Sequence, residues 1–355
     1  QISQRGTSFA SLGNGDGGTY TLDRYGFHEE GDFGAAEATV SQDTDVPTGE
    51  GFAKSLKVVC ATVDTSIATN TINYISQKFE GQMLQHLAKG TSGAKSTTLS
   101  FFCKSNLTGT FTINFIDMDN TRMFSTSYSL ASANTWEKIT INVPADTTGA
   151  LDNDNASSYR INWNLQAGTD KTGGALTTAW EAQAEGDRAV GQTNFYSSTD
   201  NNWYITGVQW EVGDAATDFE RLPHDVQLDR CMRYCYVHNN DADSSQALIF
   251  PGATRGSTNK FFYIQHPRPM RDTPSVTVSG EIRIINCTAG DHADADDTLA
   301  IGGVTPSVQG QNANEKGVTL AYTGAVSGIT DTANTGYMMM FIKETDNKLT
   351  MDAEL

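Results

Sequence analysis

Two loop aromatics are the side chains best suited to contact a ligand. Trp180 and Tyr196 lie in or beside segments rich in Gly, Ser and Asn. A ring beside amide side chains suits a sugar, because the ring stacks on the apolar sugar face while the amides form hydrogen bonds. Packing in the core or between subunits is the alternative. Trp203 and Trp210 lie in a strand-like run, where we expect burial.

Acidic and amide side chains cluster at three turns and suggest calcium as an alternative. The clusters are Asp117 with Asp119 and Asn120, Asp152–Asn155, and Asp291–Asp297. None follows the twelve-residue EF-hand loop, which needs a mid-loop Gly and a closing Glu. Asp and Asn favour turns by themselves. We therefore predict turns and no cofactor; a structural calcium ion has no specific motif in its favour.

The cysteines do not form a disulfide framework, because they are few and odd in number: Cys60, Cys103, Cys231, Cys235 and Cys287. Cys60 and Cys103 fall in apolar, strand-like runs, which predicts buried thiols. Cys231 and Cys235 share one face of a predicted helix. A zinc site would need two further ligands, and the sequence has no second Cys pair and no spaced His pair. We predict packing for both.

The sequence carries no motif of enzymatic chemistry. The nucleophile elbow, the P-loop, the zinc-protease helix and a dinucleotide-binding turn before a helix are all missing. The Gly-rich run Gly13–Gly18 lacks a strand–loop–helix context and predicts a flexible loop. The six His are scattered. Paired carboxylates for glycoside hydrolysis stay open, since two of 42 acidic residues will lie close somewhere. We predict a protein that is not an enzyme.

Short strands separated by turns must position these residues. Thr, Ser, Asn and Gly are abundant, a bias that favours strands and turns over helices. The first series of predicted strands covers Ser55–Val63, Thr97–Ser105, Gly109–Met118, Arg122–Leu130, Trp136–Pro144, Tyr159–Ala167 and Asn202–Val212. The segment between Gly109 and Leu130 reads as a hairpin. Such a series predicts an antiparallel sandwich or barrel.

The spacing of apolar residues changes after Pro223. Four residues at helical spacing, together with Tyr236, define one apolar face and predict a helix: Leu228, Cys231, Met232 and Cys235. A second series of predicted strands follows it at Gln246–Gly252, Asn259–Pro267, Pro274–Gly280, Glu281–Thr288, Gly317–Gly324, Gly336–Glu344 and Lys348–Leu355.

The chain is therefore predicted to be all-β and to have three parts. They are a jelly-roll β-sandwich over 1–222, a short linking α-helix within 223–238, and a small β-sandwich over 239–355. The last strand of the first domain is Asn202–Val212, with a bulge at Gly207 where simple alternation slips. In this strand Ile205, Val208, Trp210 and Val212 are available for packing. The segment after it reads as an exit that ends at Pro223, a good first residue for a helix.

The charge restricts the partners. The formal net charge is −18, from 24 basic and 42 acidic side chains, and no basic patch is visible. Binding to nucleic acid through phosphates is therefore not expected, and an anionic membrane surface would repel the chain. No apolar run approaches the ~20 residues that span a membrane. We predict no membrane insertion.

Several segments together resemble a family of bacteriophage and prophage tail-fibre and virion-appendage proteins. "QRGTSF" followed by "YTLDRYGF" is similar to the opening of that family. "LSFFCKSNLTGTFTINF" and "ANTWEKITINVPADTTG" resemble its central hairpins, and "YITGVQWEVGDAATDFERLPHDVQLDRCMRYC" its most recognisable segment. "HPRPMRDTPSVTVS" and "MDAEL" resemble its C-terminal unit. The resemblance spans almost the whole chain. Cys235 departs from it, since an aromatic residue is more usual there.

The resemblance implies a jelly roll like a carbohydrate-binding module, a short helix and a small β domain. Proteins of this kind are commonly trimeric virion appendages, so three helices would pack their Leu228 and Met232 faces around an axis. The family's opening usually has one more strand, so we expect residues ahead of Gln1.

Three functions follow as hypotheses. The first is a tail fibre, spike or head fibre on the virion surface that binds host-surface glycans and other virion proteins. The second is a decoration protein with an architectural role only. The third is a glycan depolymerase. The sequence favours it least, because it contains no long repeat series of the kind that predicts the β-helix of such enzymes.

Overall fold

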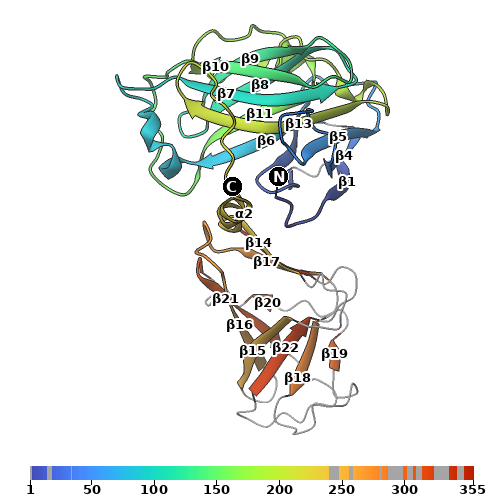
Figure 1. Cartoon of the computed structure of the whole chain (residues 1–355), viewed down its shortest axis with the longest axis vertical. Coiled ribbons are helices and arrows are strands. Elements are labelled where there is room, and N and C mark those ends of the chain that lie inside the picture. Colours follow the sequence, from blue (N-terminus) through green and yellow to red (C-terminus); the bar gives the residue numbers. More distant parts are fainter. Residues whose placement is uncertain are drawn as a thin grey trace. The chain divides into compact units, whose positions relative to one another are not determined.

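A computed structural model of the chain describes residues 2–13, 18–32, 34–239, 248–255, 259–279, 282–286, 299–301, 307–308, 314–323, 336–341 and 348–355. These residues form two compact units. Unit 1 contains Gln1–Pro223 together with Leu355, and unit 2 contains His224–Glu354. Figure 1 shows both units as strands with few helices. The all-β prediction with antiparallel sheets is confirmed.

Unit 1 is a sandwich of two antiparallel sheets (Figure 1). Sheet A has, in spatial order, β1 (Ser8–Gly13), β4 (Glu37–Asp43), β5 (Ser55–Thr62), β13 (Asn202–Val212), β7 (Thr97–Ser105) and β10 (Glu137–Val143). Sheet B has β12 (Glu181–Ala182), β9 (Arg122–Leu130), β8 (Gly109–Asp117), β11 (Ser157–Ala167), β6 (Ile72–Glu80), β3 (Gly26–Glu30) and β2 (Thr19–Tyr20). The connections carry the short helices η1 (Gly81–Met83), η2 (Gln85–Leu87), α1 (Thr169–Thr172), η3 (Glu185–Asp187) and η4 (Phe195–Ser197).

Alternation along each strand builds the core of unit 1. In β11, the side chains of Tyr159, Ile161 and Trp163 point into the core, and all three are buried. In β7, Leu99 and Phe101 do the same from the opposite sheet. Successive side chains along a strand point to opposite faces of the sheet. The residues that alternate with these core residues therefore lie on the outer faces of the two sheets.

Several sequence predictions are confirmed in this unit. The predicted hairpin is β8–β9, which pairs without interruption from Gly109 opposite Leu130 to Asp117 opposite Arg122. Cys60 and Cys103 are free, buried thiols, and burial raises the pKa of Cys60 to about 11. Strand β13 has the predicted bounds.

Of the four residues of β13 that were expected to pack, three lie in or against the core and Val212 does not. The strand shifts register between Thr206 and Gln209, so the bulge expected at Gly207 is confirmed. Ile205 is fully buried, while Val208 and Trp210 pack partly buried against the core. Val212 is 43% exposed, because the strand has run past the edge of the core at its last residue.

Unit 2 begins with α2 (His224–Met232) and contains two further sheets. One sheet has β14 (Cys235–Asn239), β23 (Lys348–Asp352) and β17 (Ser275–Ser279). The other has β19 (Leu299–Ile301), β18 (Ile282–Asn286), β22 (Gly336–Phe341), β15 (Leu248–Arg255), β16 (Asn259–Gln265), β21 (Gly317–Thr323) and β20 (Ser307–Val308). Its described core joins both sheets through Phe262, Ile264, Leu349 and Met351. The predicted division at 222 and 238 stays a prediction.

None of the helices in the described residues is both long enough and apolar enough to cross a membrane.

Candidate functional site

A hollow of about 240 Å³ lies on the outer face of sheet A. We call it the Phe102 hollow, after the ring that β7 contributes to it. Strands β7, β10 and β13 supply one part of its lining, and two loops supply the rest. The lining residues are Gly49, Glu50, Ser100, Phe101, Phe102, Lys138, Gly207, Thr217, Asp218, Phe219 and Arg221.

The bulge in β13 makes room for the aromatic part of this hollow. Gly207 has φ +61°, a left-handed conformation that glycine adopts without strain. A Cβ at this position would lie 2.6 Å from the ring of Phe52 and 3.2 Å from that of Phe102. These two rings are themselves edge to face, with centroids 5.7 Å apart. The glycine therefore allows two aromatic rings to lie against the strand.

The segment after β13 folds back and forms one wall of the hollow. Phe219 packs edge to face on Phe52 with centroids 5.0 Å apart. The Arg221 guanidinium lies 5.0 Å from the Phe52 ring and donates a hydrogen bond of 2.8 Å to the Gly51 carbonyl. The Glu220 amide donates to the Gln209 side chain at 2.7 Å. We predicted only an exit here, and the structure shows a built wall.

Charged groups surround the rings. The exposed ammonium of Lys138 lies 6.0 Å from the Phe102 ring. Beside it, partial burial favours the neutral form of Glu211, but hydrogen bonds from Thr217 and Gln209 and the charge of Lys138 lower the pKa of this carboxyl. Exposed Glu50, Asp218 and Arg221 complete the rim. The hollow thus offers apolar ring surface together with donors and acceptors of both charges.

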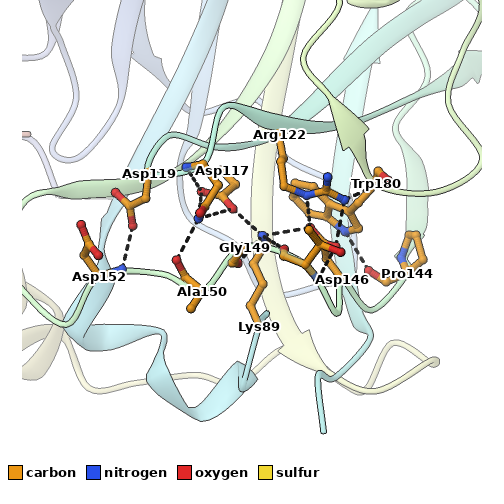
Figure 2. A network of polar contacts seen from close by, with 12 residues as sticks. Lys89, Asp117, Asp119, Arg122, Pro144, Asp146, Gly149, Ala150, Asp152 and Trp180 are labelled. Atoms are coloured by element: carbon orange, nitrogen blue, oxygen red, sulfur yellow. Dashed lines mark hydrogen bonds and ion pairs between the residues drawn. The ribbon is translucent and has the colours of Figure 1, made fainter. Parts of the chain in front are cut away.

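Trp180, the first predicted sugar contact, lies elsewhere and is half-buried. Its indole N–H donates to the Pro144 carbonyl at 2.8 Å, as Figure 2 shows. Its ring packs against Tyr159 and Phe124, with centroids 5.8 and 6.4 Å away. The cavity beside Trp180 and Trp210 measures only about 20 Å³, room for about one water molecule. A sugar does not fit there.

A buried ammonium organises the loops around Trp180 (Figure 2). Lys89 forms ion pairs with Asp117 and Asp146, the latter at 2.9 Å. It also donates to the carbonyls of Thr148 and Gly149 at 3.1 and 3.0 Å. The same ammonium lies 5.1 Å from the Trp180 ring. One cation therefore joins the η2 turn, the β8–β9 hairpin and the 144–149 loop.

Arginine completes this network. Arg122 donates two hydrogen bonds to the Asp146 carboxylate, at 2.8 and 3.0 Å. Burial favours the neutral form of Asp146, but the hydrogen bonds from Arg122 and Lys89 lower its pKa. Protein cations thus neutralise the buried carboxylates, which fits a clamp between loops.

Turn geometry accounts for the acidic clusters that suggested calcium. Asp117 accepts hydrogen bonds from the Asn120 backbone and side chain, and Asp119 accepts from the Asp152 amide at 2.8 Å (Figure 2). Asp154 caps a turn by accepting from the Ala156 amide. Among the residues that the structure describes, no group of three or more His, Cys, Asp or Glu could hold a metal ion. The third cluster, 291–297, lies outside those residues.

Tyr196, the second predicted sugar contact, is fully buried in η4. Its hydroxyl donates to the Asn73 side chain at 2.9 Å, and its ring packs edge to face on Phe195. The Gly/Ser/Asn-rich sequence around it forms a capped turn, in which Asn194 accepts from the Tyr196 amide. No face of this ring is open to a ligand.

The predicted helix face is shorter than expected. Helix α2 ends at Met232, and Cys235 is the first residue of β14, where it is fully buried. The segment Cys235–Asn239 pairs with β23 as a strand, and this pairing outweighs the helical spacing. A strand also suits Tyr236 and Val237, whose residue types favour β structure. Leu228, Cys231 and Met232 are half-buried. Packing of these residues in a trimer stays a prediction.

Comparisons with known proteins gave weak likenesses in structure. No family model and no curated protein matches the chain. One similar structure is the enzymatically active domain of tailspike protein 4 of bacteriophage CBA120, with TM-score 0.31 and 14% identity; the match covers 57% of this chain and 21% of that one. A CBM4 structure has TM-score 0.29 and 14% identity over 53% and 87% of the two chains.

A third likeness is to the family 11 carbohydrate-binding module of the cellulosomal cellulase Lic26A-Cel5E of Clostridium thermocellum. Its TM-score is 0.29 and its identity 11%, over 58% of this chain and 95% of that one. At TM-scores this low, no fold or activity carries over from any of the three.

Proposed function

We propose that this chain is a structural protein of a phage virion, a tail fibre, spike or head fibre, and that it binds host-surface glycans through the Phe102 hollow. The hollow carries the binding proposal. It combines the rings of Phe102 and Phe219 with the charged side chains of Lys138, Asp218 and Arg221. Sugars need this pairing of apolar surface and hydrogen-bonding groups.

The resemblance of the sequence to virion-appendage proteins supports the place on the virion surface and a homotrimer with other virion proteins as partners. The hollow is smaller than the roughly 300–1,000 Å³ of a drug-sized pocket, which fits a single sugar ring at a shallow site. Three such sites on a trimer would strengthen a weak contact through multivalency.

An array of immobilised bacterial-surface glycans tests the proposal. We expect full-length protein to bind a subset of them, and Phe219→Ala to bind those glycans more weakly while its Tm stays close to that of the wild type. No binding to any glycan would overturn the binding proposal and favour a purely architectural decoration protein. Release of new reducing ends from a bound glycan would instead reveal a depolymerase.

Electron cryomicroscopy of the intact virion tests the location. A trimeric appendage on head or tail is the expected result. A monomer mass in multi-angle light scattering at micromolar concentration would contradict the trimer.

A further inference from the structure

Trp136 lies one row of residues beyond the Phe102 hollow on the same face of sheet A. In the β7–β10 register Lys138 is opposite Phe102, and in the β13–β7 register Tyr204 is opposite Lys104. Trp136 immediately precedes β10, and its ring contacts the Tyr204 and Lys104 row. Two residues along a strand correspond to about 7 Å. A second ring therefore stands about one row away from the first.

The Trp136 ring is held in place from three sides while it remains half-buried. Its indole N–H donates to the Asp45 carboxylate at 2.9 Å. The Tyr204 ring meets it at 67°, with centroids 6.0 Å apart. The Lys104 ammonium lies 5.4 Å from its centroid. A side chain that is already fixed loses little conformational entropy when a ligand stacks on it.

The carboxylate that holds the indole is also the partner of a lysine. Burial favours the neutral form of Asp45, but hydrogen bonds from Lys104 and Trp136 lower its pKa. The same Lys104 forms an ion pair with Asp45 and lies 4.3 Å from the Tyr204 ring. The position of the indole is therefore set by a hydrogen bond to a carboxylate that is itself paired with Lys104.

We infer that the Phe102 hollow and Trp136 are two contacts of one binding face, and that its ligand is an oligosaccharide chain rather than a single sugar. This inference rests on the proposed function. The oligosaccharide crosses β7 and β10, with one sugar over the hollow and another against the indole of Trp136. Lys138, which is opposite Phe102 and two residues after Trp136, donates hydrogen bonds to the linking part of the oligosaccharide.

An architectural role for Trp136 is the alternative. The indole would then only fasten the loop at Asp45 to the start of β10. That role makes a different prediction: truncation of the ring would lower stability but would leave the dependence of affinity on glycan length unchanged.

Isothermal titration calorimetry with a series of one to six sugar units, prepared from a glycan that binds in the array, tests the inference. For full-length wild type we expect affinity to rise by about tenfold between one unit and the longer members. Trp136→Ala should lose this gain and bind all lengths as the wild type binds the single unit. Trp136→Phe, which keeps a ring but not the N–H, should retain most of the gain.

Phe219→Ala serves as the matched control, because it changes the hollow and should weaken binding at every length. The second contact would be overturned if the affinity of Trp136→Ala rose with glycan length as much as that of the wild type. It would also be overturned if the affinity of the wild type did not rise with length. In both cases the proposed glycan binding stands. If the wild type binds no member of any series, the proposed function itself fails.

Discussion

The outer faces of the two sheets of unit 1 differ: that of sheet B is covered by another segment, and that of sheet A is open. On sheet B, residues 168–193, which we call the cover, lie over polar side chains. Asn114 and Asn164 both donate to the Arg188 carbonyl of the cover, at 2.6 and 3.1 Å. On sheet A, the equivalent face carries aromatic rings beside an open hollow.

This difference shows that the polarity of the outward side chains does not reveal which face of a sheet is open to solvent. At the centre of sheet B the outward residues are polar but fully buried: Asn114, Asn162 and Asn164 have no exposed surface. Those of sheet A include Phe102 and Trp136, which remain half-buried. The open aromatic face is therefore the one expected to bind, and the covered face to carry stability.

The largest expected effect concerns the ion pair that holds the cover. Arg188 is 1% exposed and donates two hydrogen bonds to Glu30, at 2.6 and 3.0 Å. Arg188→Ala should lower the free energy of unfolding by roughly 2–4 kcal/mol, less than for a wholly buried pair because Glu30 is 36% exposed. Urea unfolding measures this. The control Lys57→Ala, which removes a surface pair with Asp43 on sheet A, should cost under about 1 kcal/mol. Equal losses would remove the contrast between the faces.

Acid should weaken sheet B through His28. Burial, followed by the charges of Lys78 and Arg160, lowers the pKa of His28 to about 3, although Glu30 opposes this. The unfolded chain, with a His pKa near 6.5, therefore takes up a proton that the folded chain refuses. The stability from neutral His28 is complete above about pH 6.5 and is lost as the pH falls toward 3.

Thermal unfolding between pH 7 and pH 5 measures this effect. The slope should approach about 1.4 kcal/mol per pH unit for His28, and His28→Gln should remove that part of it. The window lies above the range in which Glu30, with its pKa lowered to about 2, would contribute. An unchanged slope in His28→Gln would show that this face is not the acid-sensitive one.

The bulge of sheet A should be sensitive to a single methyl group. Gly207→Ala places a Cβ at φ +61° and 2.6 Å from the Phe52 ring, so we expect a loss of about 1–2 kcal/mol and weaker glycan binding. Gly34→Ala is the matched control, because Gly34 lies outside the hollow and has a φ of +66°, but its Cβ meets nothing within 4 Å. Equal effects on binding would mean that ring packing at the hollow is not what the glycine serves.

The smallest effect on stability is expected in the wall of the hollow. Phe219→Ala removes a half-buried ring from an exposed segment, so binding should fall by up to about tenfold while stability changes little. Trp180→Phe, which keeps an aromatic ring in the clamp around Lys89, should leave glycan binding unchanged. A loss of binding in Trp180→Phe would return the site to the residue that the sequence suggested first.

Much of the fold was predictable because alternation and turn residues are local signals. The hairpin around Asp117 and the bulge at Gly207 follow from such signals. The site was not predictable, because Phe52, Phe102 and Phe219 come from three distant segments and meet only after the sheet forms. The prediction for Tyr196 was wrong for a different reason, because its polar neighbours cap a turn that buries the ring. The run at 201–223, which reads as a strand and an exit, gave no sign that its end returns to the sheet.

Hydrogen–deuterium exchange with and without a glycan that binds in the array tests the central claim most directly. The open face of sheet A predicts added protection in β7, β10 and the segment 213–222, with none in the cover. Protection confined to 168–193 and β11 would place the ligand on sheet B and contradict the account.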